Sequence, residues 1–87
     1  MNRARRNDLD ICADILSVAQ AGARKTQIVY QANLNFKIVK RYIERLTNGG
    51  MLDSEESRFY TTEKGIDFLD NYRALTSPIK ELEMIQD

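Results

Sequence analysis

The sequence predicts a mainly α-helical domain that carries one small β-hairpin, an α+β fold contained in a single domain. Apolar residues recur at helical spacing in four segments of the chain. The spacing changes after Gly50, where two short segments are joined by the polar stretch 54–57. With 87 residues, 43% of them hydrophobic, the chain is long enough to bury one small core.

The first two predicted helices have recognisable caps. Residues 8–21 form one helix, because Asn7 can cap it and acidic residues stand in its first turn. A second, shorter helix extends from a cap at Thr26 to Ala32. A tight turn at residues 33–34 then leads into the third helix, since asparagine tolerates the left-handed backbone conformation.

The third predicted helix, residues 35–48, has two faces of different chemistry. Asn35 can cap it, and Gly49 and Gly50 end it. One face is apolar and comprises Phe36, Val39, Tyr42, Ile43 and Leu46. The other face is mostly cationic and comprises Lys37, Lys40, Arg41, Glu44, Arg45 and Asn48. A solvated surface helix has the same two faces, so the interpretation of this helix depends on the elements around it.

A hairpin and a fourth helix complete the predicted domain. Residues 51–53 and 58–61 are expected to pair as antiparallel strands. Thr62 then caps a helix whose apolar residues continue to Leu75. The order of helix, helix, turn, helix, hairpin and helix is that of a winged helix-turn-helix domain. Its predicted core includes Leu16, Ile28, Leu34, Val39, Ile43, Leu46 and Leu69.

The chain divides into three predicted parts. Residues 1–7 form a flexible basic arm, residues 8–75 the winged helix-turn-helix DNA-binding domain, and residues 76–87 a C-terminal helical extension. A second apolar stripe has the spacing of a coiled-coil seam and predicts a homodimer. The stripe comprises Phe68, Tyr72, Leu75, Ile79 and Leu82. Pro78 predicts a kink or an end of the helix near Thr76, and a monomer whose tail folds back on its own core is the alternative.

A resemblance to a known family covers residues 8–75. It rests on KTQIVYQANLNFKIVKRYIERLTNGGML followed by YTTEKGIDFL, which in order and spacing resemble the small archaeal winged-helix regulators of the ArnR-like type. The resemblance implies a DNA-binding transcriptional regulator, often dimeric. The hairpin departs from a DNA-gripping wing, because Glu55 and Glu56 stand at its tip and only Arg58 remains there to meet a phosphate.

The charges and the single cysteine restrict the possible partners. The net charge is zero, but the first 50 residues hold nine basic and four acidic residues, whereas the rest holds four basic and nine acidic ones. Any affinity for nucleic acid is therefore confined to one face. Cys12 cannot form an internal disulfide, which fits a cytoplasmic location, and we expect it to pack in the core. No apolar run approaches the ~20 residues that span a bilayer, so no membrane association is expected.

The composition argues against an enzyme. The chain has no histidine, which is the usual acid–base group near neutral pH and the commonest metal ligand. Two pairs of carboxylates, Asp8 with Asp10 and Glu55 with Glu56, fall at a helix start and at a loop tip, where no pocket would separate their pKa values. We expect no catalytic residue, no metal and no cofactor, and no small-molecule ligand is evident.

The cationic face of the third helix has a direct physical case for binding double-stranded DNA. Residues near the start of such a helix reach base edges in the major groove, and later ones meet phosphates. The candidate base readers are Asn35, Lys37 and Ile38. The candidate phosphate contacts are Lys40, Arg41 and Arg45, the helix start formed by Arg24, Lys25 and Thr26, and Arg58 in the hairpin.

Two other functions remain open at this point. A winged helix can serve as an adaptor for protein–protein interaction, which the zero net charge and the acidic hairpin favour. A chromatin-type architectural DNA-binding protein is the other possibility, although such proteins usually have a clear positive excess. As a homodimer, a regulator would present two recognition helices to a palindromic site.

Overall fold

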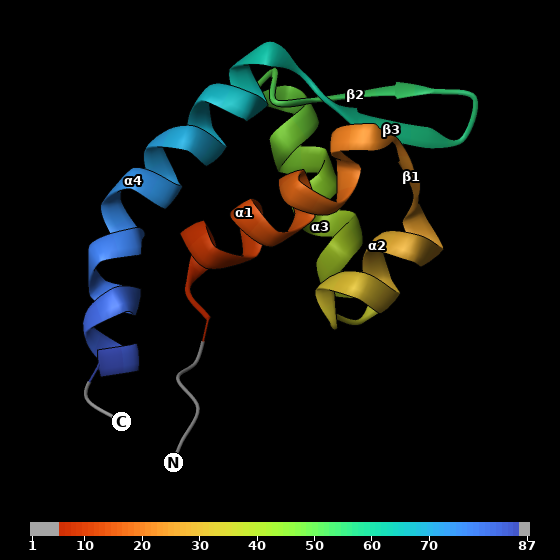
Figure 1. The fold of residues 1–87 in the computed structure, drawn as a ribbon. Coiled ribbons are helices and arrows are strands. Elements are labelled where there is room, and N and C mark those ends of the chain that lie inside the picture. The colour runs from red at the N-terminus through yellow and green to blue at the C-terminus, as the bar shows by residue number, and fades with distance from the viewer. Residues whose placement is uncertain (1–5, 86–87) are drawn as a thin grey trace.

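The computed structural model describes residues 6–85, with the backbone alone for residues 79–85. Its described elements are α1 (Asp8–Val18), the short 3₁₀ helix η1 (Ala19–Ala21), β1 (Ala23–Arg24), α2 (Lys25–Ala32), α3 (Phe36–Asn48), β2 (Leu52–Glu55), β3 (Arg58–Thr61) and α4 (Glu63–Ile85). In Figure 1, the β2–β3 hairpin and α2 lie on one side of α1 and α3, and α4 extends along the other side. The predicted winged helix-turn-helix fold is confirmed.

The predicted caps of α1 and α3 are confirmed. At the start of α1 the backbone N–H of Asp10 donates to the side chain of Asn7 over 2.8 Å, and the N–H of Asn7 donates to the carboxylate of Asp10 over 3.1 Å. This reciprocal pair is a capping box. At the start of α3 the N–H of Ile38 donates to the side chain of Asn35 over 2.8 Å. Both caps are local, which is why sequence spacing could predict them.

The predicted cap of α2 at Thr26 is wrong, because α2 begins at Lys25 and its N-cap residue is Arg24. Residues 23–24 pair with β3 as strand β1, so their extended backbone fixes where the helix can begin. Asn33 follows α2 with the expected left-handed backbone, at φ 57°. The same turn is tied to the chain before α1, since Arg6 donates to the carbonyl oxygens of Ala32 and Asn33 over 2.6 and 3.0 Å.

Arg6 therefore has a structural role, although the sequence analysis placed it in a flexible arm. Its guanidinium also donates to Asp14 over 2.8 Å, so one side chain connects α1 to the end of α2. The carbonyl groups at a helix end have no partner within the helix, and a cationic donor satisfies them. The rest of the arm predicted for residues 1–7 lies outside the described residues, apart from Asn7.

The sheet contains three strands in the order β1-β3-β2, all antiparallel. The predicted hairpin is confirmed, but β2 extends further than residues 51–53 and the connection has two residues, Glu56 and Ser57. Both have positive φ, at 51° and 72°, which is the backbone of the tight turn that matches the twist of a hairpin. Strand β1 was not predicted, since its two residues cannot show a strand period.

Buried side chains from every layer form one core. They belong to Ala13, Ile15, Leu16, Ala19, Ala23, Ile28, Ala32, Val39, Tyr42, Ile43, Leu46, Leu52 and Leu69. Of the seven predicted core residues, six are buried and Leu34 is half-buried against the others. Cys12 also packs there as expected, and burial raises the pKa of its thiol. Phe36 was assigned to the apolar face but is 53% exposed, because it stands in the first turn, beyond the edge of the core.

Two tyrosines connect α1 to its neighbours. The hydroxyl of Tyr42 in α3 donates to the carboxylate of Asp8, and that of Tyr72 in α4 donates to the carboxylate of Asp10. These bonds favour the protonated phenols, so they raise the pKa of Tyr42 and raise the pKa of Tyr72 to about 12. The first turn of α1 therefore fixes α3 and α4 relative to each other.

Helix α4 begins as predicted, with the N–H of Gly65 donating to the side-chain oxygen of Thr62 over 3.2 Å. Of the kink or end predicted near Thr76, the end is wrong, because the described backbone remains helical through Pro78 to Ile85. Proline lacks one N–H donor, so the helix has one backbone hydrogen bond fewer at Pro78. Figure 1 shows the second half of α4 continuing beyond its contact with α1.

Candidate nucleic-acid interface

Helix α3 buries one face and leaves its cationic face in solvent. Val39, Tyr42, Ile43 and Leu46 are buried along this helix. The opposite arc carries four exposed cations, Lys37, Lys40, Arg41 and Arg45, together with the exposed carboxylate of Glu44. At about 100° per residue, Lys40 lies on the edge of this arc nearer the hairpin and Arg45 on the edge nearer α1.

Three of the predicted DNA-contact residues make contacts within the domain instead. The guanidinium of Arg45 lies 5.0 Å from the ring centroid of Tyr42 and 3.9 Å from the carboxylate of Asp8. The side-chain oxygen of Asn35 is occupied by the cap of α3. Ile38 is half-buried against the core. Of the residues predicted on this helix, Lys37, Lys40 and Arg41 are exposed and form no ion pair with another described residue, although the guanidinium of Arg41 also lies 6.0 Å from the ring centroid of Tyr42.

The start of α2 presents a second polar group. Arg24, its N-cap residue, makes no side-chain capping bond, so no capping side chain occupies the first N–H groups of the helix. Arg24 and Thr26 are exposed, and Lys25 between them is half-buried. N–H groups at a helix start, with cations beside them, favour a phosphate group.

Strand β1 places Arg24 directly opposite Arg58 of β3. The same Arg58 is paired on its other side with Glu55 of β2. Like charges directly opposite each other in a sheet are destabilising, and a bound anion would relieve that repulsion. By the alternation of a strand, these side chains lie on the face of the sheet opposite to that of Phe59. Both arginines were predicted as phosphate contacts, but only strand β1, which was not predicted, brings them together.

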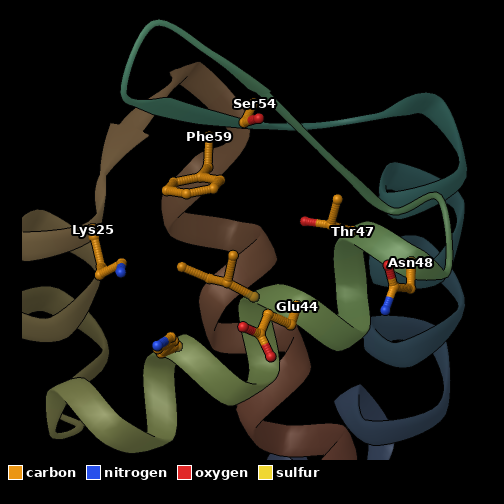
Figure 2. A pocket seen from close by; sticks show the side chains of 8 residues that line it. Lys25, Glu44, Thr47, Asn48, Ser54 and Phe59 are labelled. Atoms are coloured by element: carbon orange, nitrogen blue, oxygen red, sulfur yellow. The ribbon is translucent and has the colours of Figure 1, made fainter.

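A cavity of about 510 Å³ separates α3 from the hairpin. Its lining residues are Lys25, Lys40, Ile43, Glu44, Thr47, Asn48, Ser54 and Phe59. Figure 2 shows Phe59 and Ser54 reaching in from the hairpin, Lys25 on one side at the start of α2, and Glu44 and Thr47 on α3. This cavity was not predicted, since its walls come from α2, α3 and the hairpin, and sequence spacing does not specify how these three segments pack together.

Other kinds of site find no support among the residues that the structure describes. None of them form a group of three or more histidine, cysteine, aspartate or glutamate side chains that could hold a metal ion. Over the same part of the chain, no helix combines the length and the apolar character needed to cross a membrane.

A helix-turn-helix formed by α2 and α3, followed by a β-hairpin, defines the class of winged helix-turn-helix proteins. The family model described as "Winged helix-turn-helix" matches residues 5–80, and the chain belongs to this family. An uncharacterised protein of Methanocaldococcus jannaschii is 31% identical over 64 residues, which are 72% of this chain and 66% of that protein. The chain thus spans about two thirds of the length of this curated relative.

A solved structure shares the fold. The crystal structure of Sso10a-2, a DNA-binding protein from Sulfolobus solfataricus, superposes with a TM-score of 0.78 at 24% sequence identity. The match covers 93% of this chain and 90% of Sso10a-2. The similarity therefore includes α4 as well as the helix-turn-helix and the hairpin.

Proposed function

We propose that this protein is a DNA-binding transcriptional regulator that reads the major groove with residues 35–48. The observation that carries the proposal is the division of α3 into a buried apolar face and an exposed face with Lys37, Lys40 and Arg41. A helix held in this way by its apolar face can enter a groove without unfolding any part of the core. The description of Sso10a-2 as a DNA-binding protein and the resemblance to ArnR-like regulators support the same function.

The accessible cations suggest how the contacts are divided. Lys37 stands in the first turn of α3, so it is the residue we assign to base edges. Lys40 and Arg41 contact phosphates on either side of the groove. Arg24 and Thr26 contribute a phosphate contact at the start of α2, and Arg58 lies beside Arg24 in the sheet. We assign Arg45 and Asn35 to holding the position of α3.

The proposal is tested by titrating the protein into labelled DNA from upstream of its own gene and into a scrambled duplex, at two salt concentrations. Counterion release makes the logarithm of the binding constant fall with the logarithm of salt concentration by about 0.9 per phosphate contacted. A regulator is expected to prefer the upstream DNA at both concentrations. Equal affinity for both duplexes with a steep salt dependence would favour the architectural function, and no binding to either would favour the protein adaptor.

A specific observation supports the adaptor as the second candidate. Asp53, Glu55 and Glu56 are all exposed on the hairpin, where a wing that grips DNA would carry cations. As an adaptor, the protein would bind a basic partner through this hairpin. The titration above separates the two candidates, because an adaptor has no reason to bind duplex DNA.

We also propose that the regulator is a homodimer paired through α4. Leu75 is 75% exposed on this helix, in a stripe with Phe68 and Tyr72, which are half-buried against the domain. An apolar stripe with heptad spacing, on a helix that extends beyond the domain, is typical of a coiled-coil association surface. The side chains of Ile79 and Leu82, predicted to extend the stripe, lie outside the described side chains. Two copies would present two α3 helices to a palindromic site.

Replacing Leu75 by glutamate is expected to shift the protein from dimer to monomer without unfolding it. The side chain is exposed, so the change removes apolar surface from an interface rather than from the core. Sedimentation equilibrium measures the shift, and Ala74→Glu, at an exposed neighbouring position, is the matched control. A wild-type protein that remains monomeric at high micromolar concentration would contradict the dimer and the palindromic site.

A further inference from the structure

The cavity between α3 and the hairpin has the dimensions and lining of a small-molecule site. Its volume of about 510 Å³ lies within the roughly 300–1,000 Å³ of typical ligand pockets. Phe59 and Ile43 supply apolar surface, one half-buried and the other buried. Hydroxyl, amide and charged groups surround these two side chains, so polar contacts are available from several directions.

The charged groups of the cavity have no ionic partner among the side chains that the structure describes. Across the described residues, the ion pairs are those of Arg6 with Asp14 and of Arg45 with Asp8. Lys25 and Lys40 come from different elements, α2 and α3, and both line the same space. The start of α2 adds N–H groups that no side chain caps. Two ammonium groups in one cavity, one of them in the first turn of α2, favour an anionic ligand.

Phe59 and Glu44 restrict the class of ligand further. Figure 2 shows the ring of Phe59 with Lys25 on one side of the space and Glu44 and Thr47 on the other. A planar ring of a ligand can pack on Phe59 while its anionic group meets the lysines. Glu44 accepts hydrogen bonds and donates none, so it favours a ring that carries an amino group.

We propose that this cavity binds a small planar aromatic anion that carries an amino group, of the size of a purine mononucleotide. Lys25 and Lys40 bind its phosphate or carboxylate, Phe59 packs on its ring, and Glu44 accepts from its amino group. Thr47, Asn48 and Ser54 contribute further hydrogen bonds at the rim.

Binding at this site has a consequence that rests on the proposed DNA-binding function. Lys40 belongs both to the cavity and to the exposed arc of α3 assigned to DNA. A ligand that occupies its ammonium group removes one phosphate contact and adds negative charge beside α3. The ligand is therefore expected to compete with DNA.

The site is tested first without DNA, so that its outcome is independent of the proposed function. Adenosine monophosphate is titrated into labelled full-length protein, and the backbone amide resonances are followed by NMR. We expect saturable shifts for residues that line the cavity, and at least about tenfold weaker binding of adenosine and of inorganic phosphate, each of which lacks half of the contacts. Absence of saturable shifts at millimolar nucleotide, or equal binding of phosphate alone, would overturn the proposal.

Two substitutions identify the site. Lys25→Gln is expected to weaken nucleotide binding about tenfold, as loss of a charge-assisted contact does, whereas Lys64→Gln on α4 is the control and leaves it unchanged. Glu44→Gln is expected to abolish the preference for adenosine monophosphate over inosine monophosphate. A glutamine side chain can also donate a hydrogen bond to the ring carbonyl of inosine monophosphate, which glutamate cannot. Glu44 is exposed, so this variant keeps the fold. Unchanged affinity in Lys25→Gln would refute the assignment.

The second stage repeats the DNA titration in the presence of the nucleotide. Competition is expected to raise the apparent Kd for DNA in the wild-type protein when the nucleotide is present. The rise should be smaller in Lys25→Gln, which binds the nucleotide more weakly. If the nucleotide binds in the first stage and leaves DNA affinity unchanged, the competition is refuted while the cavity and the DNA-binding function both stand. Failure of DNA binding alone would refute the proposed function and not the ligand site.

Discussion

The double substitution of Lys37 and Arg41 by alanine is expected to weaken DNA binding by roughly 10- to 100-fold at physiological salt, the effect of losing about two cationic contacts. Both side chains are exposed on α3, and alanine favours helix, so the variant should fold as the wild type does. The salt dependence should also become less steep, by about 0.9 units for each phosphate contact removed. Anisotropy titrations at several salt concentrations measure both quantities.

Arg45→Ala is the matched control on the same helix. This arginine is also cationic and exposed, but it lies at the edge of the arc nearer α1, over Tyr42 and beside Asp8. Its removal should leave DNA affinity close to the wild-type value. An Arg45→Ala variant that loses as much affinity as the double variant would show that the DNA-facing arc is turned toward α1. A double variant that binds normally would exclude α3 as the recognition helix.

Replacing Leu46 by alanine is expected to destabilise the domain by roughly 2–5 kcal/mol, since it removes a buried side chain and leaves a cavity. Leu46 is 5% exposed, and its carbonyl oxygen accepts from the N–H of Met51 at the end of α3. A loss of about 1 kcal/mol lowers the melting temperature of a domain of this size by roughly 4–8 °C, so the expected decrease is large. Thermal unfolding followed by circular dichroism measures it.

Leu9→Ala provides the comparison for this variant. The same leucine-to-alanine change is made there at a helical position that is 56% exposed. Little apolar surface leaves the core at that position, so the melting temperature should change by only a few degrees. Similar losses in both variants would mean that the burial of Leu46 does not decide the stability of the domain.

Local chemistry determined most of the fold. The caps at Asn7, Asn35 and Thr62 and the left-handed turn at Asn33 each depend on residues within a few positions, and the structure contains all four. The apolar stripe of α3 follows from its helical period, so the buried residues from Val39 to Leu46 could be named in advance.

Only the tertiary structure decided which side chains of different elements contact one another. Strand β1 exists because β3 passes beside residues 23–24, and this pairing moves the start of α2 and brings Arg24 against Arg58. Arg45 turns to Asp8, a residue 37 positions away along the chain, so its helical phase alone could not reveal that it helps to hold α1.

The cavity between α3 and the hairpin also depends on the packing of elements that are distant in the sequence. Lys25, Lys40 and Phe59 belong to three elements, and they meet because the hairpin stands apart from α3. Sequence spacing specifies which face of each element is polar, since that depends on bonds and angles within the element. Which polar faces then lie opposite one another depends on how the whole core packs, and that packing decides where ligands and DNA can bind.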